Sequence, residues 1–293
     1  MNKRKLLFII NPISGGKSKE KLESLISENL DRQLFEYKLL YTQYSGHAQE
    51  ILKEQATLFD VIIAVGGDGT INEIAEFLSR INIPMAMIPM GSGNGLARHL
   101  GIPLKPEKSI QALNHSEILE IDTASLNGHF FVSIAGVGFD SLIAAEFEKA
   151  KGRGFINYAR LSTKEYFAYK EENYQIILDG KKIERQAAMV SFANSNQFGY
   201  NTKIAPQANL SDGLLDVCIL KKPNIVQMPG LMKQIWTGRA DKSFLIEIIT
   251  AKHIILQPNK NSFANIDGES IKVGERIEVL LKPKSLQLFI PKK

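Results

Sequence analysis

The sequence of 293 residues contains a single cysteine, Cys218, which lies inside the apolar run Leu214–Leu220. One thiol excludes any disulfide within the chain, and this scarcity favours a reducing compartment. A small buried core residue is the simplest interpretation of the thiol. The sequence therefore predicts a cytoplasmic protein whose fold is not held by cross-links.

Long apolar runs are also missing. No stretch approaches the ~18 consecutive apolar residues of a membrane-spanning helix. The apolar stretch closest to the start, Leu6–Ile10, is too short for a secretory leader, and no small-residue cleavage site follows it. We therefore expect any contact with a membrane to be peripheral.

The chain has little excess of charge of either sign, with 36 basic and 31 acidic residues and a net charge of +5. This excess is too small and too evenly spread to indicate a nucleic-acid partner. It suits an acidic ligand or an anionic membrane surface. The hydrophobic content of 44% excludes a disordered chain and is sufficient for a sizeable core.

Apolar strand patterns and helical patterns alternate in the first part of the chain. The strand patterns are Leu6–Ile10, Tyr37–Tyr41, Val61–Val65 and Met85–Ile88, and the helical patterns are Lys19–Leu30, Ala48–Ala56, Ile71–Ser79 and Leu96–Leu100. Short continuous apolar runs separated by helices are typical of parallel strands buried on both faces. The sequence thus predicts an α/β domain with a parallel sheet between two layers of helices.

Strand patterns predominate after Pro103–Pro106, which predicts a β-rich, sandwich-like second domain. These patterns include Phe130–Ile134, Tyr174–Leu178, Ile183–Ala193, Leu214–Leu220, His253–Leu256, Ile277–Leu281 and Leu286–Ile290, and a helix is expected at Ile225–Trp236. Asp179-Gly180 between two of these patterns predicts a tight hairpin. We expect an α/β nucleotide-binding domain at residues 1–115 and a β-rich substrate and metal domain at residues 116–293. Whether the last strand returns to the first domain is left open, and the cleft between the domains is the expected ligand site.

The most informative feature is the turn Gly66-Gly67-Asp68-Gly69-Thr70, between an apolar strand and a helix. Glycines let backbone N–H groups approach a ligand closely, and the following helix N-terminus is positively polarised. A polyphosphate suits this place. A carboxylate beside phosphates requires either a bridging Mg²⁺ or a proton to accept, which gives Asp68 a chemical role. A simple connecting turn is the alternative.

A second turn, Gly91-Ser92-Gly93-Asn94-Gly95, follows the next strand in the same way. Ser92 and Asn94 can donate hydrogen bonds to phosphate oxygens. Two such turns at the carboxyl ends of neighbouring parallel strands face the same crevice of an open α/β sheet. Together they predict a nucleotide-phosphate site more strongly than either does alone.

Two common nucleotide motifs are absent. The segment Asn11–Ser18 ends in Gly-Lys-Ser, but Asn11 stands where a P-loop has its first glycine, and Pro12 lacks the N–H that the phosphate cradle uses. No G-x-G-x-x-G follows a predicted strand, so a nicotinamide dehydrogenase is not indicated.

In combination these motifs resemble those of the diacylglycerol kinase and sphingosine kinase catalytic-domain family, in its bacterial lipid kinase branch. The first domain carries the similar motifs at Asn11–Gly16, Gly66–Glu73 and Gly91–Pro103, and the second carries them at Ala135–Asp140, Ile204–Ala208, Ser211–Val217 and Asp267–Glu269. The resemblance covers nearly the whole chain. It implies an enzyme that transfers the γ-phosphate of ATP to the hydroxyl of a lipid alcohol.

The resemblance also implies a site. It places nucleotide contacts at Asn11, Pro12, Ser14, Gly15, Thr42, Gly66, Gly67, Asp68, Gly69, Thr70, Asn72, Glu73 and Ser92. It implies that Glu269 is the proton acceptor and that Asp68 lies in the Mg²⁺–phosphate region. Whether Asp68 binds Mg²⁺ or acts as a base is left open. A structural Mg²⁺ would be held by the Asp212 side chain, with Asn209 and Leu214 contributing mainly backbone carbonyls.

One departure from the family pattern affects the substrate. Many bacterial members have an acidic residue where this chain has Gly95. Diacylglycerol, a sphingoid base and other lipid alcohols therefore all stay open as substrates, as does a homodimer. NAD kinase is the alternative enzyme, because it has similar glycine-rich turns, whereas the motifs at Ser211–Val217 and Asp267–Glu269 favour a lipid kinase. A nucleotide-binding regulatory module without catalysis is the alternative of another class.

Overall fold

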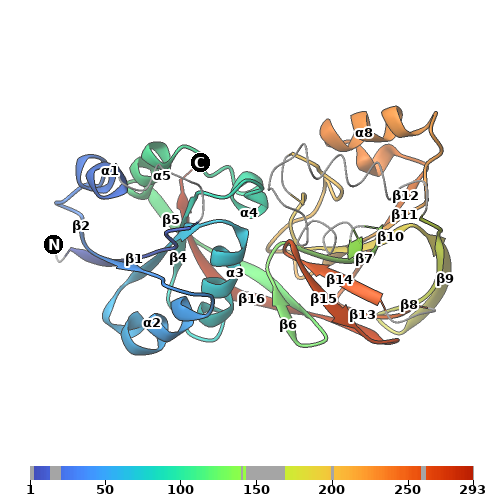
Figure 1. The fold of residues 1–293 in the computed structure, drawn as a ribbon, viewed down its shortest axis with the longest axis horizontal. Helices are drawn as coiled ribbons and strands as arrows, with labels where there is room; N and C mark the ends of the chain where they lie inside the picture. Colours follow the sequence, from blue (N-terminus) through green and yellow to red (C-terminus); the bar gives the residue numbers. More distant parts are fainter. Residues whose placement is uncertain are drawn as a thin grey trace. The chain divides into compact units, whose positions relative to one another are not determined.

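The computed structural model describes residues 3–13, 21–139, 141–142, 169–198, 201–258 and 262–292. The chain forms two compact units (Figure 1). Unit 1 comprises Met1–Ile121 and Lys284–Lys293, and unit 2 comprises Asp122–Pro283. Among the described residues, no helix is long and apolar enough to cross a bilayer.

Unit 1 contains a parallel sheet in the order β2-β1-β3-β4. Its strands are β1 (Arg4–Ile10), β2 (Phe35–Tyr41), β3 (Val61–Gly66) and β4 (Met85–Pro89), and its helices are α1 (Leu22–Asn29), α2 (His47–Gln55), α3 (Asp68–Leu78), α4 (Gly95–His99) and α5 (Pro106–Leu113), with a short 3₁₀ helix at Ala56–Leu58. Phe8 pairs with Leu39 on one side and Ile63 on the other. The predicted α/β domain with a parallel sheet is confirmed.

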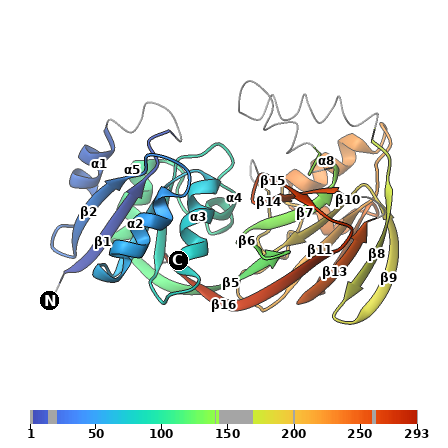
Figure 2. The ribbon, with the colours of Figure 1, turned by 60° about the horizontal axis from the view of Figure 1, so that its bottom comes forward.

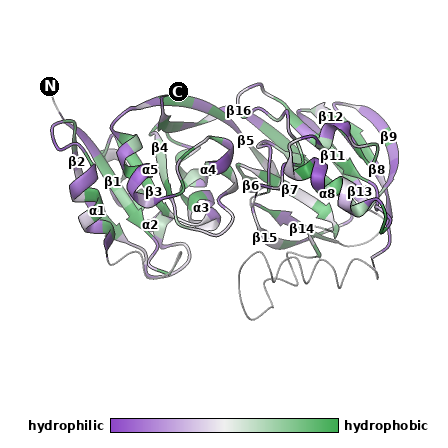
Figure 3. Cartoon of the chain, turned by 90° about the horizontal axis from the view of Figure 1, so that it is seen from above, coloured by the Kyte–Doolittle hydropathy of each residue, from purple (hydrophilic) through white to green (hydrophobic). Residues whose placement is uncertain are grey.

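Helices cover both faces of this sheet, which explains why its strands read as continuous apolar runs. Alternate residues of β1 and β3, such as Phe8 and Ile63, pack with Ile26 of α1 and Ile110 of α5 on one face. Helices α2 and α3 pack together on the opposite face (Figure 1). Figure 3 shows hydrophobic colour along β1 and hydrophilic colour on the outer side of α1. Burial on both faces is the arrangement expected of parallel strands.

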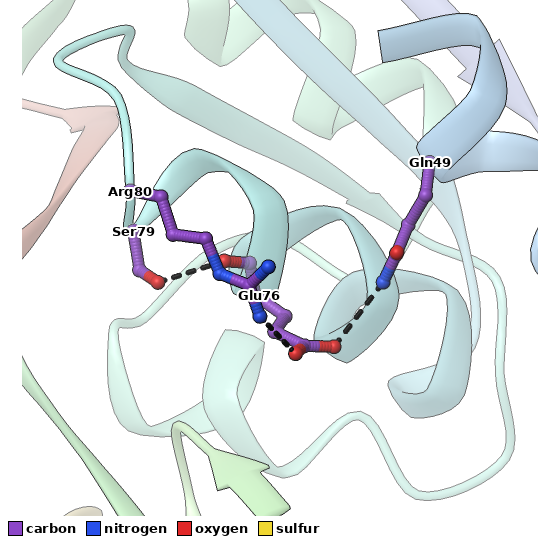
Figure 4. Close-up of polar contacts among 4 residues, drawn as sticks. All are labelled: Gln49, Glu76, Ser79 and Arg80. Atoms are coloured by element: carbon purple, nitrogen blue, oxygen red, sulfur yellow. Dashed lines mark hydrogen bonds and ion pairs between the residues drawn. The ribbon is translucent and has the colours of Figure 1, made fainter. Parts of the chain in front are cut away.

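Polar contacts tie α2 to α3 at the surface (Figure 4). Gln49 of α2 donates a hydrogen bond to Glu76 of α3 at 3.1 Å, and the other carboxylate oxygen of Glu76 pairs with Arg80. The Ser79 hydroxyl donates to the backbone carbonyl of Glu76 at the end of the helix. These contacts fix α3, the helix that begins at the first glycine-rich turn, against its neighbour.

Unit 2 is a sandwich of two mainly antiparallel sheets (Figure 2). One sheet has the order β12-β11-β10-β7-β14-β15, and the other contains β13, β8 and β9 beside β16. The bounds are β5 (Ser116–Leu126), β6 (His129–Phe131), β7 (Ile134–Gly138), β8 (Glu172–Leu178), β9 (Lys181–Ala187), β10 (Met189–Ala193), β11 (Leu215–Leu220), α8 (Met228–Trp236), β12 (Ile246–Ala251), β13 (His253–Pro258), β14 (Ser262–Ile266), β15 (Glu269–Val273) and β16 (Ile277–Pro291). Residues from both sheets, such as Phe192 and Ile254, share one core. The predicted β-sandwich is confirmed.

Strand β16 belongs to both units. Ile277 pairs with Leu256 of β13 in unit 2, and Leu288 pairs with Met85 of β4 in unit 1. Lys284, with φ of 46°, marks the passage between the two parts. The two separate patterns seen in the sequence, Ile277–Leu281 and Leu286–Ile290, therefore belong to one strand, which passes through the left-handed residue Lys284 between them.

Three further sequence expectations were wrong in detail. Helix α3 begins at Asp68, not at Ile71, so the acidic residue belongs to the first helical turn. Residues 106–113 form a helix in a region expected to be rich in strands, with a proline in the first turn, where helices accept it. The pattern Ile183–Ala193 is two strands, β9 and β10, which belong to different sheets. The predicted hairpin at Asp179-Gly180 is confirmed, with φ of 48° and 86°.

The core of unit 2 gives a direct test of the fold. Phe131 is fully buried in the sandwich core, whereas 48% of Phe263 is exposed. We expect Phe131→Ala to lower the free energy of unfolding by about 3–5 kcal/mol, because it removes buried contacts and leaves a cavity. The matched variant Phe263→Ala should cost about 1 kcal/mol or less. Denaturant titration of both variants measures this, and equal losses would contradict the placement of Phe131.

Candidate functional site

The two glycine-rich turns of unit 1 touch each other. They follow the neighbouring parallel strands β3 and β4, and the backbone N–H of Met90 donates to the carbonyl of Gly66 at 2.7 Å. A Cβ atom on Gly91 would lie only 2.7 Å from the Cα of Gly67 and 2.9 Å from Oδ1 of Asn94. Any side chain at position 91 would push the turns apart, so glycine is required there for close approach of the backbones.

Asp68 joins these turns. One of its carboxylate oxygens accepts from the backbone N–H of Asn94 at 2.9 Å, and the other accepts from that of Gly95 at 3.0 Å. Asp68 opens α3, and Asn94 precedes α4, so a single carboxylate lies at the N-termini of two helices. Both termini carry partial positive charge, which stabilises the carboxylate there.

Asn94 completes the second turn. It adopts a left-handed backbone conformation with φ of 51°, which asparagine tolerates better than most residues. Its side chain accepts from the backbone N–H of Gly91 at 3.0 Å and donates to the carbonyl of the same residue at 2.8 Å. The turn is thus closed on itself before a ligand arrives.

The electrostatics of Asp68 combine opposing effects. Burial raises the pKa of this carboxyl above its ordinary value, while the N–H groups of Asn94 and Gly95 and the charge of Arg98 act in the opposite direction. Arg98 is fixed by a bond from its Nε to the carbonyl of Gly93 at 2.9 Å. The sequence identified Asp68 but gave no sign of these partners, of which the nearest, Asn94, lies 26 residues further along the chain.

The first turn of the chain lies beside the same helix. Nδ2 of Asn11 donates to the hydroxyl of Thr70 at 3.0 Å, and the N–H of Ile13 donates to Oδ1 of Asn11. Pro12 lies between them, and the backbone N–H of Thr42 donates to the carbonyl of Ile10 at 2.9 Å. Asn11 and Thr70 are therefore together, with Thr42 at the neighbouring strand end. Ser14 and Gly15 lie outside the described residues.

The other residues of α3 that were predicted to contact the nucleotide lie in different parts of the helix. Gly69 and Thr70 are in its first turn, and Asn72 is one residue beyond that turn. Glu73 instead accepts from the backbone N–H of Ala48 at 3.1 Å, at the start of α2. Its carboxylate is therefore bonded to a helix N-terminus of the scaffold.

A pocket of about 320 Å³ lies beside the second turn. Its walls come entirely from unit 1 and consist of Pro89, Met90, Gly91, Ser92, Asn94, Arg98, Leu104 and Pro106. Ser92 is the predicted nucleotide contact among them that offers an exposed hydroxyl. Arg98 brings positive charge to the same wall, a feature that sequence reasoning missed because an arginine in a short helix carries no distinctive pattern.

In unit 2, Glu269 is held by a tight hairpin. Asp267 and Gly268 form the turn between β14 and β15 with φ of 47° and 96°, and Glu269 pairs with Ile266 across it. The Asp267 carboxylate accepts three backbone N–H bonds, at 2.8, 3.0 and 2.9 Å, from the residues Val132, Ser133 and Ile134. Asp267 thus anchors the hairpin, while Glu269 is exposed at the first position of β15.

The loop with the predicted metal ligands is fixed by a buried carboxylate. Asp122 has no exposed surface, and its Oδ2 accepts from the N–H of Gly213 at 2.7 Å. Buried Asn194 donates to the carbonyls of Asp122 and Val132, both at 2.8 Å. It therefore connects this loop to the residues that hold Asp267. Asn194 was not identified from the sequence, because a lone asparagine near a strand end has no characteristic spacing.

The predicted Mg²⁺ ligands Asn209, Asp212 and Leu214 lie in one loop. The side chains of Asn209 and Asp212 each accept a backbone N–H two residues ahead, at 3.0 Å. Burial and, secondly, the Asp212 charge raise the pKa of Asp216 to about 6, so two carboxylates repel each other here. In the described part of the chain no three acidic, histidine or cysteine residues cluster tightly enough to hold a metal ion. A Mg²⁺ ion would therefore need backbone carbonyls, such as that of Leu214, in addition to the carboxylates.

Comparison with known families covers both units. Residues 5–126 match the diacylglycerol kinase catalytic domain, and residues 133–290 match the YegS C-terminal NAD kinase beta sandwich-like domain. The chain belongs to the family that has the YegS C-terminal NAD kinase beta sandwich-like domain, because that match spans more than half of its residues. The two matches together confirm the resemblance found in the sequence motifs.

Relatives with the same organisation are bacterial. The "Diacylglycerol kinase" of Bacillus subtilis is 29% identical over 268 residues, which is 89% of this chain and 88% of that protein. A protein of Pseudomonas aeruginosa named "Probable lipid kinase YegS-like" is 26% identical and covers 99% of this chain and 96% of its own length.

The solved structures that resemble this family member have the same fold. The crystal structure of a diacylglycerol kinase from Bacillus anthracis superposes with a TM-score of 0.75 and is 21% identical, covering 99% of this chain and 98% of that chain. A second crystal structure from the same organism has a TM-score of 0.82 and 24% identity, with the same coverage.

The contact between the glycine-rich turns can be tested by adding one methyl group. We expect Gly91→Ala to destabilise the protein by about 1–3 kcal/mol, because its Cβ would overlap Gly67. The control is Gly274→Ala, since a Cβ at position 274 meets no atom within 4 Å. Thermal unfolding of both variants measures the difference, and an unchanged melting temperature for Gly91→Ala would refute the contact.

Proposed function

We propose that the protein is an ATP-dependent lipid kinase that transfers the γ-phosphate of ATP to the hydroxyl of a lipid alcohol. The observation that carries the proposal is the pair of glycine-rich turns that Asp68 holds together at the carboxyl edge of the parallel sheet. Nucleotides bind at this edge in open α/β sheets. Membership of the lipid kinase family supplies the reaction class.

The phosphates would bind where α3 begins. The first N–H groups of a helix have no partner within the helix and attract anions. At α3 these groups belong to Asp68, Gly69 and Thr70. The Ser92 hydroxyl and the first turn at Asn11 would add donors from the neighbouring strand ends. A Mg²⁺ ion bound with the nucleotide would neutralise charge on the transferring phosphate.

In this proposal one role of Asp68 is to position the two glycine-rich turns. Each of its oxygens accepts one backbone N–H, which keeps both turns in place. A carboxylate oxygen has more than one acceptor site, so Asp68 can also bind the Mg²⁺–phosphate group or accept a proton. Binding the Mg²⁺–phosphate group would require the ionised carboxylate, which the hydrogen bonds from Asn94 and Gly95 support against the opposing effect of burial on the pKa.

Glu269 is the proposed general base for the lipid hydroxyl. Glu269 is an exposed residue at the start of β15, a position from which it would reach a substrate. The three backbone bonds to Asp267 restrict movement of the hairpin that carries it. A positioned base of this kind contributes roughly 10²–10⁴-fold to the rate. A Mg²⁺ ion held by Asp212 with the carbonyls of Asn209 and Leu214 would stabilise the loop beside Asp122.

A diacylglycerol-like lipid is the first substrate to test, because the Bacillus subtilis relative is named for that activity. The hydroxyl acceptor class also includes sphingoid bases. The experiment is a radiolabelled-ATP assay with Mg²⁺ on diacylglycerol, phosphatidylglycerol, a sphingoid base and NAD⁺. We expect label in a lipid product and none in NADP⁺. Labelled NADP⁺ alone would identify an NAD kinase, and nucleotide binding without any transfer would indicate the regulatory module.

The role of Glu269 can be separated from folding. We expect Glu269→Gln to lower kcat by about 10²–10⁴-fold, because glutamine cannot accept the hydroxyl proton at neutral pH. Affinity for ATP with Mg²⁺, measured by calorimetry, should stay within about twofold, because Glu269 is assigned no nucleotide contact. The matched control, Glu275→Gln, changes an exposed glutamate in the turn after β15 and should leave kcat unaltered. Wild-type turnover in Glu269→Gln would remove Glu269 from the mechanism.

A further inference from the structure

The connection between β11 and β12, Lys221–Leu245, has an unusual surface and is here called the α8 segment. Twelve large hydrophobic side chains are exposed in the described part of the protein. Four of them lie in this one connection, namely Ile225, Val226, Trp236 and Phe244. Several exposed apolar side chains in one connection make it a candidate interaction surface, whereas isolated ones are ordinary.

The α8 segment packs on unit 2 through buried apolar side chains. Leu231 and Ile235 of α8 and the following Leu245 are buried in a hydrophobic cluster of unit 2. Side chains on the other side of the α8 segment therefore face away from this hydrophobic cluster. The exposure of Phe244, at 79%, next to buried Leu245 follows from this alternation.

The turn before α8 is closed by two reciprocal hydrogen bonds. The N–H of Asn224 donates to Oε1 of Gln227, and the N–H of Gln227 donates to Oδ1 of Asn224, both at 2.9 Å. Ile225 and Val226 lie between these residues and are 67% and 87% exposed. Two β-branched apolar residues are thus held outward on an ordered turn, although burying them in the protein would be favourable.

Positive charge accompanies this apolar surface. The α8 segment contains five basic residues and one acidic residue, which gives +4 of the chain's net +5. Four of the basic side chains are exposed, at Lys221, Lys233, Arg239 and Lys242. Asp241, the acidic residue, pairs with Lys242 at 3.2 Å. The N–H of Lys221 donates to the carbonyl of Leu245, the residue after Phe244, at 2.9 Å.

We propose that the α8 segment is the surface with which the protein docks onto an anionic lipid bilayer. Apolar side chains inserted at the headgroup level and cations above them are the features of interfacial binding. Trp236, at the end of α8, has an amphipathic ring of the kind enriched at membrane interfaces. The choice of a membrane over a protein partner rests on the proposed function, since a lipid kinase must reach its substrate in a bilayer, and on the charge of the segment.

Vesicle sedimentation tests the apolar part. The full-length protein is mixed with vesicles of equal parts phosphatidylglycerol and phosphatidylcholine, or of phosphatidylcholine alone. We expect wild-type protein to bind the anionic vesicles. The double variant Ile225→Ser with Val226→Ser should bind them more weakly by a factor of about ten or more. The control is Leu58→Ser, which changes a side chain that is 62% exposed in unit 1 and should bind as wild type.

The charged part has its own pair of variants. Lys233→Gln should weaken binding to the anionic vesicles about fivefold at low salt, and Lys181→Gln, which alters an exposed lysine of β9, should not. Strong binding of wild-type protein to phosphatidylcholine alone would overturn the anionic preference. Unchanged vesicle binding in the double variant would overturn the proposal that the α8 segment is the docking surface. If the same variant also changes a dimer into a monomer on gel filtration, the segment is a dimer interface, and the proposal is again overturned.

Failure of this proposal is distinguishable from failure of the proposed kinase reaction. Vesicle binding requires no turnover, so it can be measured even when no lipid is phosphorylated. Phosphate transfer to a short-chain lipid in detergent micelles requires no docking, so the double variant should retain wild-type transfer there. If the double variant loses both vesicle binding and phosphate transfer in micelles, circular dichroism shows whether it is still folded. A folded variant that has lost both would contradict a role confined to the surface.

Discussion

The structure of unit 1 depends on one carboxylate placed between two helix N-termini. Asp68 opens α3 and accepts the N–H groups at the start of α4, so the loops after β3 and β4 cannot move independently. Glycine at position 91 makes this pairing sterically feasible, and Asn94 supplies the left-handed bend that aims its N–H at Asp68. The glycine-rich sequence therefore gives a preorganised loop pair, not a flexible one.

Unit 2 uses the same physical device at a different place. Asp267 accepts three backbone N–H groups from residues 132–134, and buried Asp122 accepts that of Gly213. A carboxylate can satisfy several N–H groups in an irregular loop at once, which no neutral side chain does as well. Asn194 joins the two loops by donating to the carbonyls of Val132 and Asp122. The hairpin with Glu269 and the loop with Asp212 thus belong to one hydrogen-bonded network.

Part of this was predictable from the sequence. Continuous apolar runs predicted the parallel strands, and glycines at their carboxyl ends predicted which turns would meet, because parallel strands end at one edge. The partners of Asp68 and Asp267 were not predictable, since they are backbone N–H groups far along the chain and carry no residue signature. The separation of β9 from β10 was also missed, because a strand that changes sheets keeps its apolar pattern while Ala188 turns the chain.

The tripeptide Asp267-Gly268-Glu269 shows why the position of a carboxylate decides its chemistry. Asp267 accepts three backbone N–H bonds, which hold its side chain in one orientation, so it is suited to fixing a turn. Glu269 is two residues away on the other side of a glycine with positive φ, and it is exposed. In the proposed reaction the proton acceptor is the exposed Glu269, whereas Asp267 holds the turn. The hairpin therefore carries an anchoring carboxylate and the proposed base within three residues.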